Sequence, residues 1–235
     1  DGLILIKPSL EADFEMDMYN SDGSQGAMCG NGIRCVAKYV YDYGLTDKDE
    51  ISIATKSGIK YVKLQVENGK VKTVRVDMGA PILNAGLIPI VSENPQVINE
   101  AITAGGREYR MTGVSMGNPH CVVFCNDINS IDIEKIGPAF ENSELFPEKI
   151  NTEFVEIVDK NILNMRVWER GSGETLACGT GASAAVVAAV LNGFCAKNEN
   201  ITVNLKGGTL TINYSDDAVY MTGSAKEVFE GVVEV

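Results

Sequence analysis

The sequence predicts an α+β protein of two pseudo-symmetric lobes that arose by internal duplication, each a curved β-sheet or barrel around one central helix. Two Cys-Gly-x-Gly segments, Cys29–Gly32 and Cys178–Gly181, lie 149 residues apart in the 235-residue chain. A stretch of alternating polar and apolar residues precedes each segment, as in strands, and an apolar stretch of helical length follows it. A chain of this length can hold two small domains.

The similarity of the two copies extends beyond the cysteines. At the same offset Asn20 matches Glu169, each nine residues before its cysteine. Downstream, ISIATKSG from Ile51 matches ITVNLKGG from Ile201, and VDMGA from Val76 matches VYMTG from Val219. The common order and the nearly constant offset indicate a duplication rather than chance similarity.

Each copy predicts the same series of elements. A strand leads into the glycine-rich cysteine turn, a helix follows, and a glycine ends the helix. The helix of the second copy is nearly all Ala and Val, so we expect protein to surround it. The strands are expected at Phe14–Tyr19 and Met165–Trp168, the helices at Ile33–Tyr43 and Ala182–Asn192, and hairpin turns at Glu67–Lys70 and Ser215–Asp217.

The repeat also predicts the domain boundaries. We expect a first lobe at residues 1–85, a second lobe at 86–220, and a C-terminal strand at 221–235 that returns to the first lobe. The second copy begins near Val114, so its counterpart in the first copy would lie upstream of Asp1. On this reasoning the first lobe lacks an N-terminal segment of roughly 35–40 residues.

Composition argues against several classes of function. The chain contains twenty Lys and Arg residues and thirty-two Asp and Glu residues, and the resulting net charge of −12 disfavours nucleic acids and anionic membranes as partners. No apolar run reaches the ~20 residues that span a bilayer, and no secretory signal is visible. Six cysteines without a CxxC motif, beside a single histidine, fit neither a disulfide scaffold nor a zinc site. We therefore expect reduced thiols and a cytoplasmic protein.

Cys29 and Cys178 are the candidate catalytic pair. A thiol at a helix N-terminus faces free N–H groups and the positive end of the helix dipole, which favour the thiolate. The same N–H groups can bind a carboxylate. Inversion of a carbon stereocentre needs a base on one face and an acid on the other, and a thiolate with a thiol supplies both. Such a reaction needs no metal and no pyridoxal cofactor.

The remaining cysteines have weaker indications. Cys35 falls inside the first helix and is expected to be buried, without a catalytic role. Cys121 and Cys125 alternate with Val123 on one strand face and indicate core positions. Cys195 follows a helix end, and no role is assigned to it. Trp168 matches Tyr19 in the repeat and is expected to pack rather than to stack on a ligand.

Four segments together carry a resemblance to a known family. NSDGSQGAMCGNGIRCVAKYVYDYG and ERGSGETLACGTGASA resemble the two signature regions of diaminopimelate epimerases, and VSMGNPHCVVF and NTEFVEIV are similar to further parts of that family. The resemblance covers essentially the whole chain. It implies a cofactor-independent enzyme that interconverts LL- and meso-diaminopimelate, in the biosynthesis of lysine and peptidoglycan precursors.

The resemblance also implies roles for individual residues. Cys29 and Cys178 would exchange the proton, and His120 and Glu169 would tune the thiols. The family's N-terminal strand and its HGLGND-like loop, which contributes a substrate-binding Asn, have no counterpart in this sequence. The residues implied to bind substrate are Asn20, Gly30, Asn31, Asn118, Asn151, Glu169, Arg170, Gly179 and Thr180.

Other functions remain open from the sequence. Proline racemases also use paired cysteines, but carry a His in the first motif where this chain has Asn31. Histidine racemases of related shape are a second alternative within this fold, and a thiol-redox protein with a Cys29–Cys178 disulfide is one outside it. We expect a small-molecule substrate and no nucleic-acid or membrane partner. The oligomeric state is open, with a homodimer as one expectation.

Overall fold

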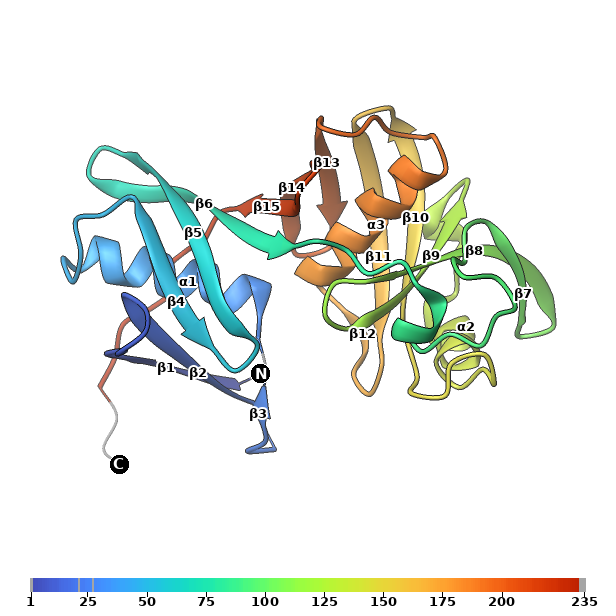
Figure 1. The fold of residues 1–235 in the computed structure, drawn as a ribbon, viewed down its shortest axis with the longest axis horizontal. Coiled ribbons are helices and arrows are strands. Elements are labelled where there is room, and N and C mark those ends of the chain that lie inside the picture. The colour runs from blue at the N-terminus through green and yellow to red at the C-terminus, as the bar shows by residue number, and fades with distance from the viewer. Residues whose placement is uncertain (1, 21, 27, 233–235) are drawn as a thin grey trace. The chain divides into compact units, whose positions relative to one another are not determined.

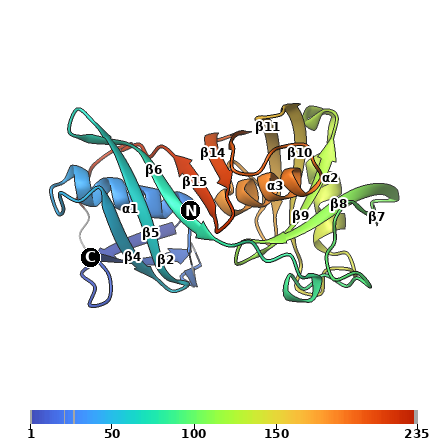
Figure 2. The ribbon, with the colours of Figure 1, turned by 45° about the horizontal axis from the view of Figure 1, so that its top comes forward.

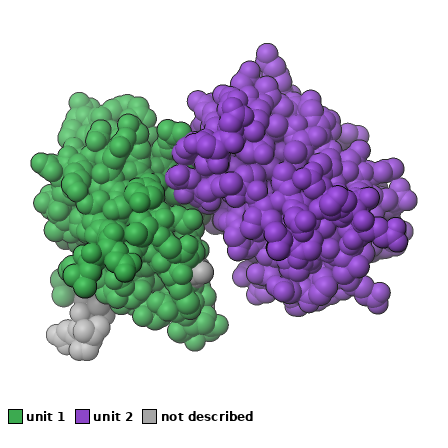
Figure 3. All heavy atoms as spheres, viewed as in Figure 1, with its two compact units in different colours: residues 1–76, 222–235 green, residues 77–221 purple. Residues whose placement is uncertain are grey.

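A computed structural model of the chain describes residues 2–20, 22–26 and 28–232. The chain divides into two compact units, one of Asp1–Val76 with Thr222–Val235 and the other of Asp77–Met221 (Figure 3). Each unit combines a β-sheet with helices, so the predicted α+β class with an internal duplication is confirmed.

The first unit is a sheet of strand order β1-β2-β4-β5-β6 with one long helix, α1 (Figure 1). The short strand β3 pairs with β2 beside this path. The turn between β5 and β6 is the predicted Asn68-Gly69 pair, and both residues have the positive φ that such a two-residue hairpin requires. The elements are β1 (Gly2–Lys7), β2 (Phe14–Asn20), β3 (Gln25–Gly26), α1 (Gly30–Asp42), β4 (Glu50–Thr55), β5 (Gly58–Glu67) and β6 (Lys70–Gly79).

The second unit repeats this arrangement and extends it by further strands. Its strand order is β15-β14-β13-β11-β10-β9-β8-β7, with β12 paired to β11. The elements are η1 (Ala85–Leu87), β7 (Glu100–Ala104), β8 (Arg107–Ser115), β9 (Pro119–Cys125), η2 (Ile128–Ser130), α2 (Ile133–Glu141), β10 (Asn151–Asp159), β11 (Ile162–Glu169), β12 (Gly173–Thr175), α3 (Gly179–Leu191), β13 (Asn200–Leu205), β14 (Gly208–Tyr214) and β15 (Val219–Gly223).

The strand registers of the two units agree residue by residue. Leu3 opposes Tyr19 in the first unit, and Thr152 opposes Trp168 in the second, both at an offset of 149. The pairs β2–β4 and β11–β13 are both parallel, while β4–β5 and β13–β14 are both antiparallel. A one-residue slip would exchange the faces of a strand, so matching registers mean that equivalent residues face the same way.

Each sheet packs against its central helix. Helix α1 lies against β4 and β5 and buries one side, which includes Ile33, Val36 and Val40 (Figure 2). Helix α3 contacts β8, β9, β10 and β14 and is buried from Gly179 to Ala189 except at Thr180, as its Ala- and Val-rich composition predicts. A second core layer in this unit joins α2 to the sheet through Phe140 and Phe154.

Three predicted elements differ from the structure. Both helices begin three residues earlier than predicted, at Gly30 and Gly179, because the preceding cysteine is itself the N-cap. The strand predicted for 221–235 ends at Gly223, and residues 224–232 contain neither helix nor strand. A strand needs a neighbour for its backbone hydrogen bonds. Instead, Val228 and Phe229 of this segment are almost fully exposed.

In the part of the chain that the structure describes, no helix is long and apolar enough to cross a membrane.

Candidate active site

Cys178 forms the N-cap of α3. Its backbone is extended, with φ −126° and ψ 113°, and its Sγ accepts a hydrogen bond from the Gly181 N–H at 3.4 Å. The Thr180 hydroxyl lies 3.4 Å from the same sulfur. A cysteine in the N-cap position satisfies one of the free N–H donors of the first helical turn, as Ser or Asp does elsewhere. The others remain for a ligand.

The environment of Cys178 favours the thiol rather than the thiolate. The side chain is only 6% exposed. Burial raises the pKa of Cys178, and the charges of Glu169 and Glu153 raise it further, which outweighs the hydrogen bonds from Thr180 and Gly181. The expectation that the helix N-terminus lowers the pKa is therefore wrong for this residue, because desolvation and two nearby carboxylates oppose the dipole. At neutral pH Cys178 holds its proton.

His120 and Glu153 form a fully buried pair beneath this helix start. His120 Nδ1 lies 2.7 Å from Glu153 Oε1, and His120 Nε2 lies 3.0 Å from Asn118 Oδ1. Both nitrogens of the ring are thus used, one by a carboxylate and one by an amide. Burial raises the pKa of the Glu153 carboxyl, and His120 opposes that shift.

Three expected binding residues, Asn151, Glu169 and Arg170, lie close together where β10 begins and β11 ends. Asn151 pairs in register with His120 across the parallel β9–β10 ladder. Its Oδ1 accepts a 3.0 Å hydrogen bond from the backbone N–H of Arg170. The Arg170 side chain donates from Nη1 to the Glu148 carbonyl, at 2.8 Å, and Glu169 Oε1 accepts from the Thr175 hydroxyl, at 2.5 Å.

Glu141 supports the turn that follows Glu169. Its Oε1 accepts from the Gly171 N–H at 3.2 Å, and its Oε2 accepts from the indole Nε1 of Trp168 at 2.8 Å. Trp168 also covers Gly137 so closely that a Cβ there would lie 2.3 Å from its ring. Trp168 is a packing residue in this unit, as the sequence predicts.

The first unit presents its cysteine in the same way. Cys29 is the N-cap of α1, with φ −133° and ψ 114°, and its Sγ accepts from the Gly32 N–H at 3.3 Å. Cys29 is half-buried, whereas Cys178 is buried. The Arg34 Nη1 donates to the Gly30 carbonyl at 3.0 Å and to Asn31 Oδ1 at 3.1 Å, so this buried guanidinium holds the first turn of the helix.

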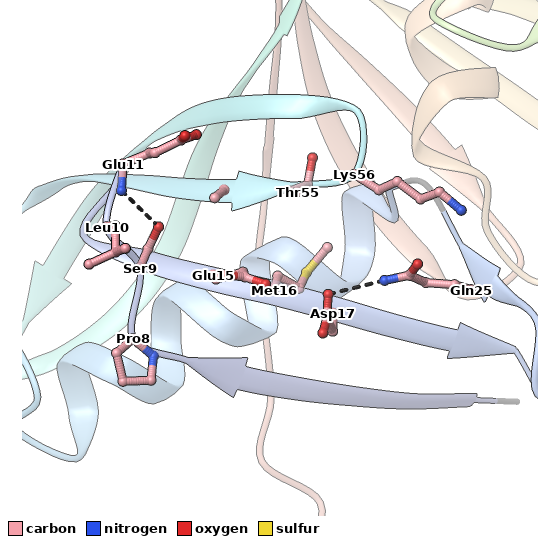
Figure 4. Close-up of a pocket in the computed structure, with 11 residues that line it drawn as sticks. Pro8, Ser9, Leu10, Glu11, Glu15, Met16, Asp17, Gln25, Thr55 and Lys56 are labelled. Atoms are coloured by element: carbon pink, nitrogen blue, oxygen red, sulfur yellow. Dashed lines mark hydrogen bonds between the residues drawn. The ribbon is translucent and has the colours of Figure 1, made fainter.

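Asn20 is exposed at the end of β2, where its Nδ2 donates to Ser24 Oγ at 3.0 Å. A separate hollow of about 590 Å³ lies over the neighbouring strand ends (Figure 4). It holds an Asp17–Gln25 hydrogen bond of 3.2 Å and the side chain of Glu15. None of the expected site residues lines it, so it is not part of the candidate site.

The second unit therefore brings together Asn118, His120, Asn151, Glu169, Arg170 and the first turn of α3, and the first unit holds Asn20 and the first turn of α1. Sequence reasoning missed Glu153 and Arg34. Arg34 lies within the NGIRC segment, but an Arg in a helix usually indicates a solvated face. Glu153 lies two residues after Asn151 in the segment NTEFVEIV, and a Glu is rarely buried in a protein core.

The other cysteines follow the predictions in part. Cys121 is buried on β9, and Cys125 on the same strand is half-buried against the core. Cys35 is exposed, so its predicted burial is wrong. The reason is its place on α1, where it shares the outer face with Tyr39 and Tyr43 one and two turns further on. Cys195 is buried.

The fold and the paired cysteine caps define a protein of the racemase and epimerase fold. A crystal structure of a hydroxyproline epimerase from Agrobacterium vitis with bound trans-4-hydroxy-L-proline matches 95% of this chain and 71% of its own, with a TM-score of 0.68 at 16% identity. At that identity the match shows the fold alone.

Sequence comparison defines the family. The family model for diaminopimelate epimerase matches residues 1–84 and 112–228. A diaminopimelate epimerase from Agathobacter rectalis is 57% identical over the whole chain, which covers 85% of that protein. A diaminopimelate epimerase from Methanococcus maripaludis is 55% identical at the same coverage. The chain belongs to the diaminopimelate epimerase family.

Proposed function

We propose that this protein interconverts LL- and meso-diaminopimelate by moving one proton at the α-carbon between two thiols. Membership of the family supports the substrate. The observation that carries the mechanism is the placement of Cys29 and Cys178 at equivalent N-caps, each bonded to the N–H three residues on. A two-base inversion needs one proton-transferring group on each face of the stereocentre, and each group acts as the base in one direction and as the acid in the other.

The proposed step is balanced in protons. The thiolate of one cysteine takes the α-proton, and the C–H bond breaks as the electron pair moves toward the substrate carboxylate. The thiol of the other cysteine then gives its proton to the opposite face. Since the surroundings of Cys178 raise its pKa, we assign Cys178 as the proton donor in the resting protein and Cys29 as the base. The roles exchange when the reaction reverses.

The helix starts supply binding groups for the reacting end of the substrate. The N–H groups of Gly30, Asn31, Gly179 and Thr180 lie in the first turns, where backbone donors have no helical partner. They would bind the α-carboxylate and stabilise the charge that develops on it. Asn20, Asn118, Asn151, Glu169 and Arg170 would bind the distal amino-acid group of diaminopimelate. We also propose that His120 and Glu169 tune the pKa of the catalytic thiols. For Glu169 this proposal is supported by its charge, which raises the pKa of Cys178.

The repeat supports a proposal for the complete first lobe. In the second unit β10 pairs with β9 on one side and β11 on the other, while in the described residues β1 pairs with β2 alone. A counterpart of residues 114–151 would cover this edge of β1 and complete the binding site. We also propose a cytoplasmic location, in keeping with cysteines that are all free, and a homodimer as the working state.

The test is α-proton exchange in heavy water with the full-length protein. LL-diaminopimelate should gain deuterium at one α-carbon and appear as the meso form. Proline and histidine, offered at the same concentration, serve as substrates of the alternative racemases. Exchange with either of them but not with diaminopimelate would contradict the proposal.

A further inference from the structure

The buried Glu153 has no counterpart in the first unit. At the repeat offset of 149, the residue of the first unit that is equivalent to Glu153 is Ile4. The strand pairing agrees with this equivalence, because Ile4 pairs with Met18 and Glu153 pairs with Val167. Each side chain lies against the third residue of the central helix of its unit, Gly32 in α1 or Gly181 in α3. A Cβ on Gly32 would lie 2.5 Å from Ile4 Cδ1, and a Cβ on Gly181 would lie 2.6 Å from Glu153 Oε1. One unit fills this place with an apolar side chain and the other with a carboxyl group.

Burying a carboxyl group at this position is energetically unfavourable. Glu153 is 0% exposed, and its Oε2 has no hydrogen-bond partner among the described residues. Packing alone would be served as well by the isoleucine of the other copy, because burying a polar group without full compensation is unfavourable. What Glu153 adds is its 2.7 Å contact with His120, another side chain that is 0% exposed.

The hydrogen-bond chain determines where the protons lie. The Oδ1 atom of Asn118 can only accept, so His120 Nε2 must carry the hydrogen of their 3.0 Å contact. The Nδ1–Oε1 contact then needs one further proton between His120 and Glu153. The pair therefore holds two protons and is neutral overall, as a buried pair should be. Because the Oδ1 atom of Asn118 is bound to His120, its amino group is the part that can donate a hydrogen bond to another partner.

We propose that Glu153 is a positioning residue that, through His120, determines which end of the Asn118 amide is offered to the substrate. The proposal rests on the proposed function, in which Asn118 binds a group of diaminopimelate. An amino group turned outward binds a carboxylate, whereas a carbonyl oxygen turned outward would repel it. The titratable groups facing the pair are Cys121 on β9, Glu169 on β11 and Cys178 at the start of α3.

The first experiment needs no substrate. His120 is the only histidine in these 235 residues, and comparison of the imidazole ¹⁵N NMR spectra of the full-length wild type and a His120→Gln variant identifies the signals of its ring. We expect a proton on Nε2 and a second proton in the Nδ1–Glu153 contact. Replacement of Glu153 by Met should remove the second signal, while the same replacement of Glu156, further along β10, should leave both in place. An Nε2 atom without a proton in the wild-type protein would overturn the proposal, whatever the protein's activity.

The second experiment separates positioning from general damage to the fold. Glu153→Met should raise KM by about ten- to a hundredfold with kcat little changed, because it weakens binding in the ground state and the transition state alike. Glu153→Gln should restore KM to within about threefold, since its amide can donate to Nδ1 and keep Nε2 protonated. The control Glu156→Met should match the wild type.

A double-mutant cycle identifies the path of the effect. Asn118→Asp still accepts from His120 but offers no donor to the substrate. If Glu153 acts through Asn118, Glu153→Met should change KM little in the Asn118→Asp background. Additive effects, or a loss of kcat alone, would overturn the proposal. A wild-type protein without activity on diaminopimelate would instead refute the proposed function, and the NMR result would still decide the role of Glu153.

Discussion

The two units share a backbone but not an electrostatic environment. Cys29 and Cys178 occupy the same N-cap, with φ and ψ within about 10° of each other, and each accepts one N–H bond. Around Cys29 lie Ile4 and the cation Arg34, while around Cys178 lie the carboxylates of Glu153 and Glu169. Duplication thus supplied two equivalent thiol positions, and the neighbours of Cys178 raise its pKa and keep it in the thiol form.

The central helices show a second difference. Helix α1 exposes Tyr39 and Tyr43, whose rings stack with centroids 4.4 Å apart, whereas α3 is buried nearly throughout. The second unit also contains strands β7, β8 and β9 and helix α2, and of these β8 and β9 contact α3. Burial at the start of α3 raises the pKa of Cys178.

The largest effect should follow loss of either thiol. Cys29→Ala and Cys178→Ala should each reduce epimerisation by about 10²–10⁴-fold or more, because each removes one of the two groups that transfer the proton. The measurement is conversion of LL- to meso-diaminopimelate by the full-length variants. Near-normal activity in either variant would show that the equivalence of the two caps has no catalytic meaning.

The two glycines at the third helical position should respond differently to alanine. In Gly181→Ala the new Cβ meets a carboxyl oxygen that His120 holds in place, so we expect the free energy of unfolding to fall by about 1–3 kcal/mol. In Gly32→Ala it meets only the terminal methyl of Ile4, which can rotate away. Denaturant unfolding of both variants measures the difference. An equal loss at both positions would mean that Glu153 is no more rigid than Ile4.

The raised pKa of Cys178 predicts how stability changes with pH. The folded protein holds this proton more tightly than the unfolded chain, whose thiol titrates near ~8.5. Above that pH the unfolded chain releases the proton while the folded protein keeps it, so the free energy of unfolding should fall. In Cys178→Ala this fall should be smaller between about pH 8.5 and 10. Identical pH profiles for variant and wild type would contradict the assignment of Cys178 as the resting thiol.

The smallest effect should come from the exposed thiol. Cys35 lies on the outer face of α1, and its counterpart in the repeat is Ala184. Cys35→Ala should leave the exchange rate within about twofold of wild type, since surface substitutions away from a site change little. The same assay used for Cys29→Ala serves as the comparison. A large loss would give Cys35 a role that the second unit lacks.

The repeat explains how much of the fold could be predicted from the sequence. Matching Cys-Gly-x-Gly segments located both strand–turn–helix units, and the Asn68-Gly69 turn located a hairpin. The first helical turns were missed because glycine has a low helix propensity, so Gly30 and Gly179 did not look helical. The C-terminal strand was expected at residues 221–235, yet a strand depends on a partner that the sequence does not show.

The candidate site could be predicted only at the level of residue types. The cysteines, Asn118, Asn151 and Arg170 lie in motifs, whereas the pKa of Cys178 depends on carboxylates brought close by the tertiary fold. Glu153 looks like a solvent-facing strand residue until β9 places His120 against it. Cys35 was misplaced because a cysteine in an apolar helix suggests burial, although it shares its face of the helix with the exposed Tyr39 and Tyr43.

The most direct test of two-thiol transfer follows the label during the first turnovers. The full-length protein is mixed with LL-diaminopimelate in heavy water, and substrate and product are separated before much conversion. Because the thiol that donates the proton has exchanged with solvent, the meso product should carry deuterium at the inverted carbon while the remaining LL substrate still carries hydrogen. A meso product that retains the original proton would show that one group serves both faces, and would contradict the account.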